Sequence, residues 1–290
     1  SSAEREPSLR GRLVLRLKRL NMRWEARFGS RWRGGFFCLL GLACLLRRNV
    51  MPAFAETAEG AAVAARATLR QATLGAGQER PAENAVLRAL LDLQKEKTQL
   101  NKADPYLGKL TGSGRSGGKR WRLVYLATRN AVVAERKGQA PPSFFDRGWY
   151  VDGLVTAVQR FEDSPAAHVN QNGVFEFLGL GGFFFGYFAR FKWPSPEKRT
   201  TLAFQPITNN LKLFGQDWSW PFAASGAAGA GPEGDAQFEA SRLQDLNIFN
   251  FFYVDDQVAV AQGASGSVAL WGATDPEWDQ KHLIPVEGEA

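Results

Sequence analysis

The sequence predicts a mainly β fold, an antiparallel barrel or sandwich preceded by N-terminal helices. Beyond Trp121 the chain consists of short alternating or aromatic segments separated by turn residues, with no helix-length connection alternating with them. The stretch from Phe249 to Trp271 predicts a closing hairpin, in which Phe249, Phe251 and Tyr253 share one face, Val258 and Val260 continue the alternation, and Gly263 to Gly266 form the turn. Ahead of Trp121, apolar residues recur at helical spacing.

Composition separates a basic arm from a nearly neutral body. The 290 residues are 44% hydrophobic and 12% aromatic, which is ample for a packed core. The formal net charge is +7, but residues 1–50 hold twelve Lys and Arg against three acids, so they carry +9 and the rest of the chain carries −2. This distribution favours a tail that meets an anionic surface, a lipid headgroup layer or an acidic protein, and we expect no nucleic-acid partner.

Residues 1–57 are predicted to be an arm that docks on a membrane or a partner. From Leu9 to Arg33, leucines and aromatic residues recur every three or four residues among arginines, typical of a basic amphipathic helix. Two interpretations remain open for it, a retained piece of a targeting peptide or a helix on an anionic membrane face. The candidate docking residues of the arm are Arg16, Arg23, Trp24, Phe36, Phe37, Leu40 and Leu46.

The apolar run from Phe36 to Leu46 is too short to span a membrane, which takes ~20 apolar residues. We expect it to form a buried or half-inserted helix that packs on a neighbouring subunit or dips into a bilayer. Its cysteines, Cys38 and Cys44, are the only two in the chain. They suit a role as small apolar fillers, since two ligands without a neighbouring His cannot complete a zinc site.

Residues 58–110 are predicted to be helical. Alanine-rich sequence favours a helix from Ala58 to Ala76, which Gly75 and Gly77 should end. A second helix is predicted from Pro81 to Gln99, because Pro and an acid open the segment and leucines repeat along it. The Gly-rich stretch from Thr111 to Gly118 is expected to be a loop, since no strand precedes it and no Gly-Lys-Ser/Thr follows.

Residues 111–272 are predicted to form the β-domain. The expected strands, in order, are Trp121 to Ala127, Gly148 to Phe161, Val174 to Phe177, Phe183 to Lys192, Arg199 to Pro206, Lys212 to Phe214 and the closing hairpin. The low-complexity stretch 223–234 is expected to be an insertion in a loop. The tail 273–290 mixes acids with Pro276 and Pro285, and we expect it to be irregular.

The strongest functional signal is apolar. The stretch from Gly173 to Phe191 carries seven Phe and Tyr187, and alternation places Phe183, Phe185 and Tyr187 on one face with Phe184 and Phe188 near the other. A strand that is apolar on both sides predicts that one face lines the interior and the other meets a lipid, a membrane or a protein. The alternative is a barrel core covered outside by the N-terminal helices. Trp149 and Trp218 suit an apolar-to-wet interface, or plug the barrel ends.

Two segments resemble the plastid lipid-associated proteins, or fibrillins. Lys119 to Tyr125, KRWRLVY, is similar to the first strand of that family, with Trp121, Leu123 and Tyr125 on one face, and Phe249 to Trp271 is similar to its C-terminal signature. The resemblance covers roughly Asn84 to Gly272 and implies a lipocalin-like barrel that handles lipids or lipophilic pigments in chloroplasts. The chain departs from the family at Gln262, where the family usually carries Arg before the Gly of the last hairpin.

The resemblance and the arm together predict a non-enzymatic protein of the chloroplast thylakoid, an accessory subunit of a photosystem and antenna complex. Its expected partners are thylakoid lipids and photosystem or antenna subunits, and its expected ligand is a lipid, carotenoid or chlorophyll, with no covalent cofactor and no metal site. The candidate binding residues are Trp121, Tyr125, Trp149, Phe183, Phe185, Tyr187, Phe251 and Tyr253.

The two histidines, His168 and His282, are expected at the solvated surface, or as axial ligands of chlorophyll magnesium if the partner holds pigment. Asp255 and Asp256 are expected to form a turn, although two carboxylates could also hold a cation. Two alternatives remain open for the function. One is a structural docking subunit without a ligand, and the other is a lipid-modifying or lipid-transfer enzyme.

Overall fold

The computed structural model describes residues 58–75, 77–100, 106–112, 118–144, 146–164, 167–193, 200–222 and 231–284. The chain divides into two compact units, Ser1–Val50 and Met51–Ala290, and every described residue belongs to the second. The predicted docking residues of the arm, from Arg16 to Leu46, lie outside the described residues, as does most of the predicted loop insertion.

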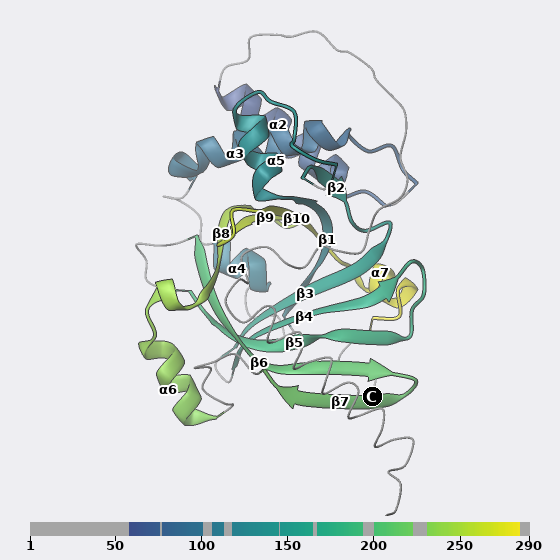
Figure 1. Ribbon diagram of the computed structural model, residues 1–290, viewed down its shortest axis with the longest axis vertical. Coiled ribbons are helices and arrows are strands. Elements are labelled where there is room, and N and C mark those ends of the chain that lie inside the picture. The colour runs from purple at the N-terminus through teal and green to yellow at the C-terminus, as the bar shows by residue number, and fades with distance from the viewer. Residues whose placement is uncertain are drawn as a thin grey trace, which may run out of the picture. The chain divides into compact units, whose positions relative to one another are not determined.

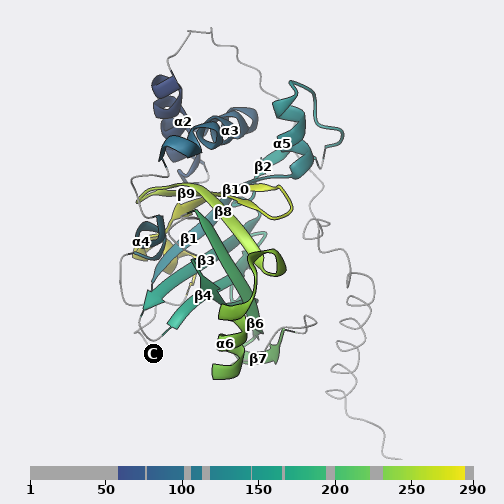
Figure 2. The same ribbon diagram turned by 90° about the vertical axis from the view of Figure 1, so that its left-hand side faces the viewer.

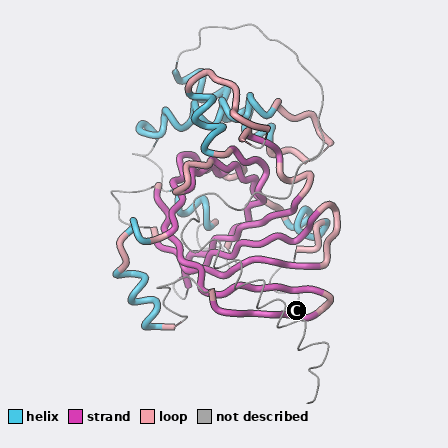
Figure 3. The backbone as a smooth tube through the Cα atoms, viewed as in Figure 1, coloured by secondary structure: helices cyan, strands magenta, loops and turns pink. Residues whose placement is uncertain are grey.

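The β-domain is a closed antiparallel barrel of eight strands, which confirms the predicted fold class (Figures 1 and 3). The ring runs β1-β3-β4-β5-β6-β8-β9-β10 and closes where β10 pairs with β1. Its strands are β1 (Lys119–Ala127), β3 (Val155–Ser164), β4 (Ala167–Phe177), β5 (Phe183–Lys192), β6 (Thr201–Leu213), β8 (Asn247–Val254), β9 (Val258–Gly263) and β10 (Val268–Ala273). The two segments that carry the family resemblance are therefore neighbours, with Ala127 opposite Val268.

Two further strands pair with the ring near one of its ends. β2 (Gly148–Tyr150) pairs with β1 from Tyr125 onward, whereas β3 pairs with β1 only up to Arg122. Similarly, β6 pairs with β8 over Thr201 to Phe204 and with β7 (Gln216–Pro221) from Thr208 onward. All eight strands of the ring are therefore paired only over part of their length. Beyond that part, β1 pairs with β2 in place of β3, and β6 pairs with β7 in place of β8.

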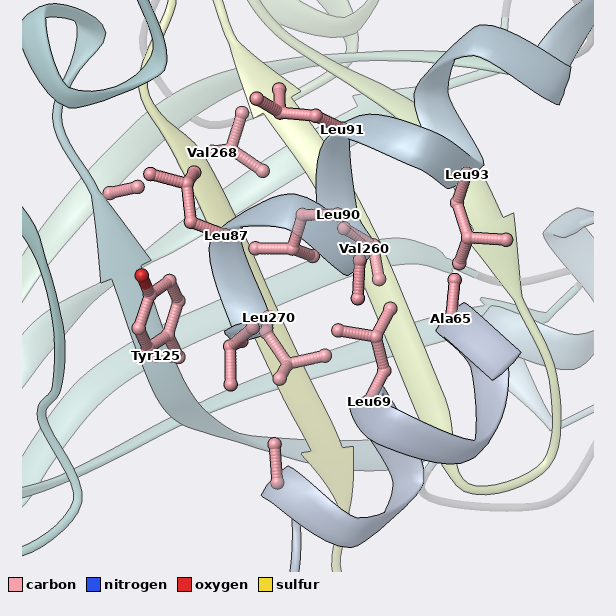
Figure 4. Packing of buried hydrophobic residues seen from close by; sticks show 14 of the residues in the cluster. Ala65, Leu69, Leu87, Leu90, Leu91, Leu93, Tyr125, Val260, Val268 and Leu270 are labelled. Atoms are coloured by element: carbon pink, nitrogen blue, oxygen red, sulfur yellow. The ribbon is translucent and has the colours of Figure 1, made fainter. Parts of the chain in front are cut away.

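The N-terminal helices cover one side of the barrel (Figure 1). α2 (Ala58–Ala72), α3 (Glu83–Leu100) and α5 (Arg129–Arg136) bury their apolar faces on the outward side chains of β1 and β8 to β10. Figure 4 shows this layer, in which leucines from α2 and α3 meet Val260, Val268 and Leu270. Burying a Leu side chain contributes roughly 1.5 to 3 kcal/mol, so this layer of several leucines stabilises the packing of the helices on the sheet.

The barrel interior is filled at one end. A second cluster draws buried side chains from strands on all sides of the ring, among them Trp121, Phe161, Phe191, Phe251 and Trp271, and such a cluster can only lie inside. The short helix α4 (Tyr106–Thr111) lies at this end of the barrel (Figure 2). There the Trp121 indole donates a hydrogen bond of 2.8 Å to the Leu110 carbonyl. The Tyr106 hydroxyl donates to the Phe252 carbonyl at 3.2 Å.

Two β-bulges correct the predicted faces of Tyr125 and Tyr253. The pairing register shifts between Leu123 and Tyr125 on β1, and between Phe251 and Tyr253 on β8. Each bulge adds one residue, so the side chains beyond it change faces. Trp121 and Phe251 point inward, while both tyrosines, which were predicted to share their faces, lie outside the ring under the N-terminal helices.

Several connections and the tail contain helices that the sequence pattern did not predict. α5 joins β1 to β2, α6 (Pro232–Ala240) begins within the predicted insertion, and the 3-10 helix η2 (Leu243–Asp245) precedes β8. The predicted strand from Gly148 to Phe161 is divided into β2 and β3, and the two predicted strands between 199 and 214 are one, β6.

The tail after Gly272 was expected to be irregular, but it contains α7 (Pro276–Lys281). Asp275 caps this helix by accepting a hydrogen bond of 2.8 Å from the Trp278 amide, and Pro276 occupies its first turn. Both are favourable helix-start signals, which the mixture of acids and proline concealed.

Candidate functional site

The inward face of β5 runs from the packed core to solvent. Residues 183, 185, 187, 189 and 191 alternate toward the interior, and Tyr187, Ala189 and Phe191 pack in the interior cluster. Phe191 and Ala189 are each 2% exposed, Tyr187 is half-buried, and Phe185 is 45% exposed. The barrel is therefore packed solid at the end near α4 and presents aromatic side chains to solvent toward its other end, which we call the open end.

Tyr187 brings a polar group to this face. Its hydroxyl accepts a hydrogen bond of 3.3 Å from the Asn172 amide on β4, and its ring stacks on Phe204 with centroids 6.4 Å apart. Burial raises the pKa of Tyr187 to about 12, although the Asn172 amide opposes this rise. The phenol is therefore neutral at physiological pH, and it can exchange hydrogen bonds with a ligand without carrying charge.

Not all of the predicted binding residues gather at the open end. Phe183, Phe185 and Tyr187 follow one another along the same face of β5, and Trp149 on β2 is partly buried against the interior cluster. Trp121 and Phe251 are fully buried within that cluster. Their rings fill the closed end, so they shape the barrel rather than meet a ligand.

Tyr125 and Tyr253 have structural partners outside the ring. The Tyr125 hydroxyl donates to the Glu83 carbonyl on α3 at 2.8 Å, and burial raises its pKa. The Tyr253 hydroxyl donates to Asp255 at 2.7 Å, and burial raises its pKa to about 12, helped by the negative charge of that carboxylate. Both tyrosines lie outside the ring, where they pack between the helical layer and the sheet, so they do not face the interior.

His282 is not part of this face. His282 follows α7 on the outside, where its Nδ1 lies 2.6 Å from Glu176 Oε2 and its ring packs on Trp278. The Thr156 hydroxyl donates to the same carboxylate at 2.6 Å and, with His282, holds the pKa of Glu176 below its ordinary value against the effect of burial. His168 lies in β4 opposite Asp163, and its side chain is outside the described part of the chain.

Gln262 shows what the departure from the family pattern does. Its side chain accepts a hydrogen bond of 2.9 Å from Gln94 on α3 and donates one of 3.0 Å to the Gly266 carbonyl in the last turn. A neutral amide thus links the closing hairpin to the helical layer.

The outward face of β5 is also apolar. Phe184 and Phe188 line a hollow of about 310 Å³ together with Phe175 from β4, and its charged residues are Arg120, Lys212 and Asp217. Gly173 leaves room for this arrangement, because a Cβ at that position would lie 1.9 Å from the Phe184 ring. The prediction of a strand that is apolar on both sides therefore describes β5 well.

Pattern reasoning missed the apolar turns at the open end. Leu178 lies between β4 and β5, and Phe214 lies between β6 and β7, and both are exposed with positive φ. The available signal was the second residue of each turn, Gly179 and Gly215, between strand-like segments, since two-residue hairpin turns commonly carry Gly at that position.

Within the described ranges, no three His, Cys, Asp or Glu side chains cluster as metal ligands would. None of the helices in that same part of the chain is long and apolar enough to cross a membrane. The fold thus defines the class as an eight-stranded antiparallel barrel with a helical layer. The chain matches no protein-family model and no curated protein, so the resemblance to fibrillins enters as a proposal.

Proposed function

We propose that this protein is a non-enzymatic, fibrillin-like barrel of the chloroplast thylakoid that binds a lipid or lipophilic pigment at its open end. The observation that carries the proposal is the gradient along the inward face of β5, from 2% exposure at Phe191 to 45% at Phe185. Leaving aromatic surface in water costs roughly 25 cal/mol per Å², and an apolar ligand would recover this free energy.

The chemistry of the face suits an amphipathic or weakly polar ligand. Phe183 and Phe185 offer apolar contacts, while Tyr187 and Asn172 offer one neutral hydrogen-bonding pair deeper along the strand. With a pKa of about 12 the phenol stays protonated at physiological pH, so it is not poised as a general base and is a weaker acid than an ordinary tyrosine. The face therefore supports binding better than the lipid-modifying alternative.

The proposed location in the chloroplast, the photosystem partner and the thylakoid attachment are inferred from the sequence. They follow from the two family-like segments, which the fold pairs as β1 and β10, and from the +9 charge of residues 1–50. The arm would hold the barrel at the anionic membrane surface or on an antenna subunit.

A second candidate function is a docking subunit without a ligand. The packed end of the barrel supports this candidate, because buried aromatic side chains occupy the interior there: Trp121, Phe161, Phe191 and Phe251. In that case the exposed aromatic residues at the open end would contact a protein neighbour.

Ligand binding at Phe185 distinguishes the two. We expect the purified full chain to bind a pyrene-labelled fatty acid, and Phe185→Asn to weaken binding by about tenfold, because the substitution removes one large apolar contact. Phe144→Asn is the matched control, since Phe144 is 49% exposed in a loop away from β5. Solvent extraction of the natural protein, followed by lipid and pigment chromatography, would identify the ligand. Equal affinities for the wild type and Phe185→Asn would refute the assigned site, and no binding at all would favour the docking role.

A further inference from the structure

Three turns at the open end hold large apolar residues where glycine or asparagine is normally found. Leu178, Phe214 and Leu283 are the non-glycine residues with positive φ in the described part of the chain, at 52°, 51° and 54°. Their exposed fractions are 56%, 89% and 70%. Positive φ is unfavourable for a side chain with Cβ, and exposure of Leu or Phe is unfavourable in water, so each position carries two costs.

The hairpin turns show how specific this choice is. Phe177 and Leu180 exchange two backbone hydrogen bonds of 3.0 and 3.1 Å, which leaves Leu178 and Gly179 as a two-residue loop with positive φ at both positions. Leu213 pairs with Gln216, so Phe214 and Gly215 form a second loop of the same kind. Such loops strongly favour Asn-Gly, and this chain has Leu-Gly and Phe-Gly instead.

The third position ends α7. The Ile284 amide donates to the Asp279 carbonyl and the Leu283 amide to the Gln280 carbonyl, which is the hydrogen-bond pattern of a helix end that usually holds Gly. Leu283 occupies that left-handed position.

The three turns lie together. Phe183 pairs with Leu213, which brings the β4–β5 and β6–β7 turns to the same end of neighbouring strands. A Cβ on Gly181 would lie 3.6 Å from Leu283 Cδ1, so the end of α7 lies beside the β4–β5 turn. Figure 1 shows both turns and α7 on one side of the barrel. We call Leu178, Leu180, Phe214 and Leu283 the apolar tips.

The charges behind the tips are balanced. The sequence from Phe177 to Phe183, FLGLGGF, holds no charged residue. Lys212 lies 3.7 Å from Asp217, Arg120 lies 3.1 Å from Asp279, and Glu176 faces His282. Trp218, next to the β6–β7 turn, is 44% exposed, and tryptophan favours the boundary between apolar and wet surroundings.

We infer that the apolar tips insert into the surface of a bilayer with uncharged or zwitterionic headgroups, and that the bound lipid enters and leaves the barrel there. This deepens the proposed function and rests on it, because the tips end the same strands whose inward face carries Phe183 and Phe185. A bilayer accepts separate apolar prongs from three segments without a complementary shape, and the balanced charges match a headgroup layer without net charge.

The test replaces the tips with a residue that suits their backbone. The variant Leu178→Asn, Phe214→Asn, Leu283→Asn removes apolar surface while Asn tolerates positive φ, so its melting temperature should equal or exceed that of the wild type. Flotation of the full chain with phosphatidylcholine vesicles at high salt suppresses the contribution of the basic arm. We expect the wild type to float and the variant to lose about tenfold or more in vesicle affinity.

Leu74→Asn is the matched control, since Leu74 is 41% exposed in the turn after α2, and it should float as the wild type does. If the asparagine variant folds poorly, the corresponding glycine variant repeats the measurement with the same backbone tolerance. Unchanged flotation of the folded variant would overturn the inference, and so would a wild type that does not float with the phosphatidylcholine vesicles. A variant that changes oligomeric state without changing flotation would show that the tips contact protein.

Binding of the pyrene-labelled fatty acid without vesicles separates this inference from the proposed function. The tip variant should bind the probe as the wild type does, while Phe185→Asn should bind it weakly and still float. A wild type that does not bind the probe would refute the ligand site, and with it lipid entry at the tips, but not the membrane contact. Flotation that does not depend on the tips would refute the membrane contact alone.

Discussion

Gly186, on the outward face of β5, shows at the scale of one residue how closely β4 and β5 pair. It lies between Phe185 and Tyr187 and opposite Gly173 on β4. A Cβ on Gly186 would stand 1.9 Å from the Asn172 carbonyl oxygen and 2.6 Å from the Gly173 Cα. Both obstacles are backbone atoms in a paired strand, so no side-chain rotation can relieve the collision.

We therefore expect Gly186→Ala to lower the free energy of unfolding by about 1 to 3 kcal/mol, the usual cost of overpacking. Urea unfolding of the variant and of the wild type would measure it. Gly153→Ala is the control, because a Cβ at Gly153 meets nothing within 4 Å and Gly153 is not among the residues with positive φ. Equal stability of the two variants would mean that β4 and β5 can separate at this point without cost.

Asp255 joins three elements, the helix α2, the strand β8 and the turn into β9. It accepts hydrogen bonds from Arg70 and Tyr253, each at 2.7 Å, and from the backbone amides of Gln257 and Val258. Burial raises the pKa of Asp255, but these hydrogen bonds outweigh burial and hold it below the ordinary value of 3.8. The folded protein therefore favours the charged carboxylate. Its contribution to stability is complete above the ordinary pKa and is lost as the pH falls through the lower pKa of the folded state.

For this reason Asp255→Asn should lower the free energy of unfolding by about 1 to 3 kcal/mol at neutral pH, and the difference from the wild type should shrink as the pH falls below the ordinary value of 3.8. Urea unfolding at both pH values would measure the two differences. Asp256→Asn is the control, since Asp256 is the exposed neighbour in the same turn. A deficit that stays constant with pH would show that charge at Asp255 is not what stabilises the contact.

At the scale of elements, sequence periodicity predicted the barrel class, the two N-terminal helices and the closing hairpin. It failed where one residue is inserted. Phe249, Phe251 and Tyr253 read as one face in the sequence, but the bulge after Phe251 sends Tyr253 outward. A bulge leaves no trace in a two-residue period, because it is set by the pairing with the partner strand, here β9.

The candidate site was predicted only in part, because alternation is a local property and the pairing of the whole sheet is not. Alternation alone placed Phe183, Phe185 and Tyr187 on one face, and the structure keeps them there. Which part of that face meets solvent depends on where β6 leaves β8 and pairs with β7, and this is a property of the whole sheet. The exposed Leu178 and Phe214 could not be predicted from propensity, since both occupy a conformation that propensity assigns to Gly or Asn.

The whole molecule combines two chemically different surfaces, the basic arm and the apolar tips. Residues 1–50 carry +9 while the rest of the chain carries −2, so attraction to an anionic surface belongs to the arm. Such attraction is screened by salt, whereas insertion of apolar side chains is not. Raising the salt concentration should therefore weaken membrane binding through the basic arm and leave binding through the apolar tips.

Removing residues 1–57 should leave the barrel folded, because every described strand pairing that closes the ring lies between Lys119 and Ala273 and the covering helix α2 begins at Ala58. Flotation with vesicles of phosphatidylcholine and phosphatidylglycerol would then test the arm. We expect the full chain to bind these vesicles more tightly at low salt than at high salt, and the shortened chain to lose that salt dependence. The variant Arg16→Gln, Arg23→Gln, which lowers the charge without shortening the chain, should fall between them. If the shortened chain keeps the full salt dependence, the arm is not the anionic-surface contact. Membrane attachment would then rest on the apolar tips and the aromatic strand β5.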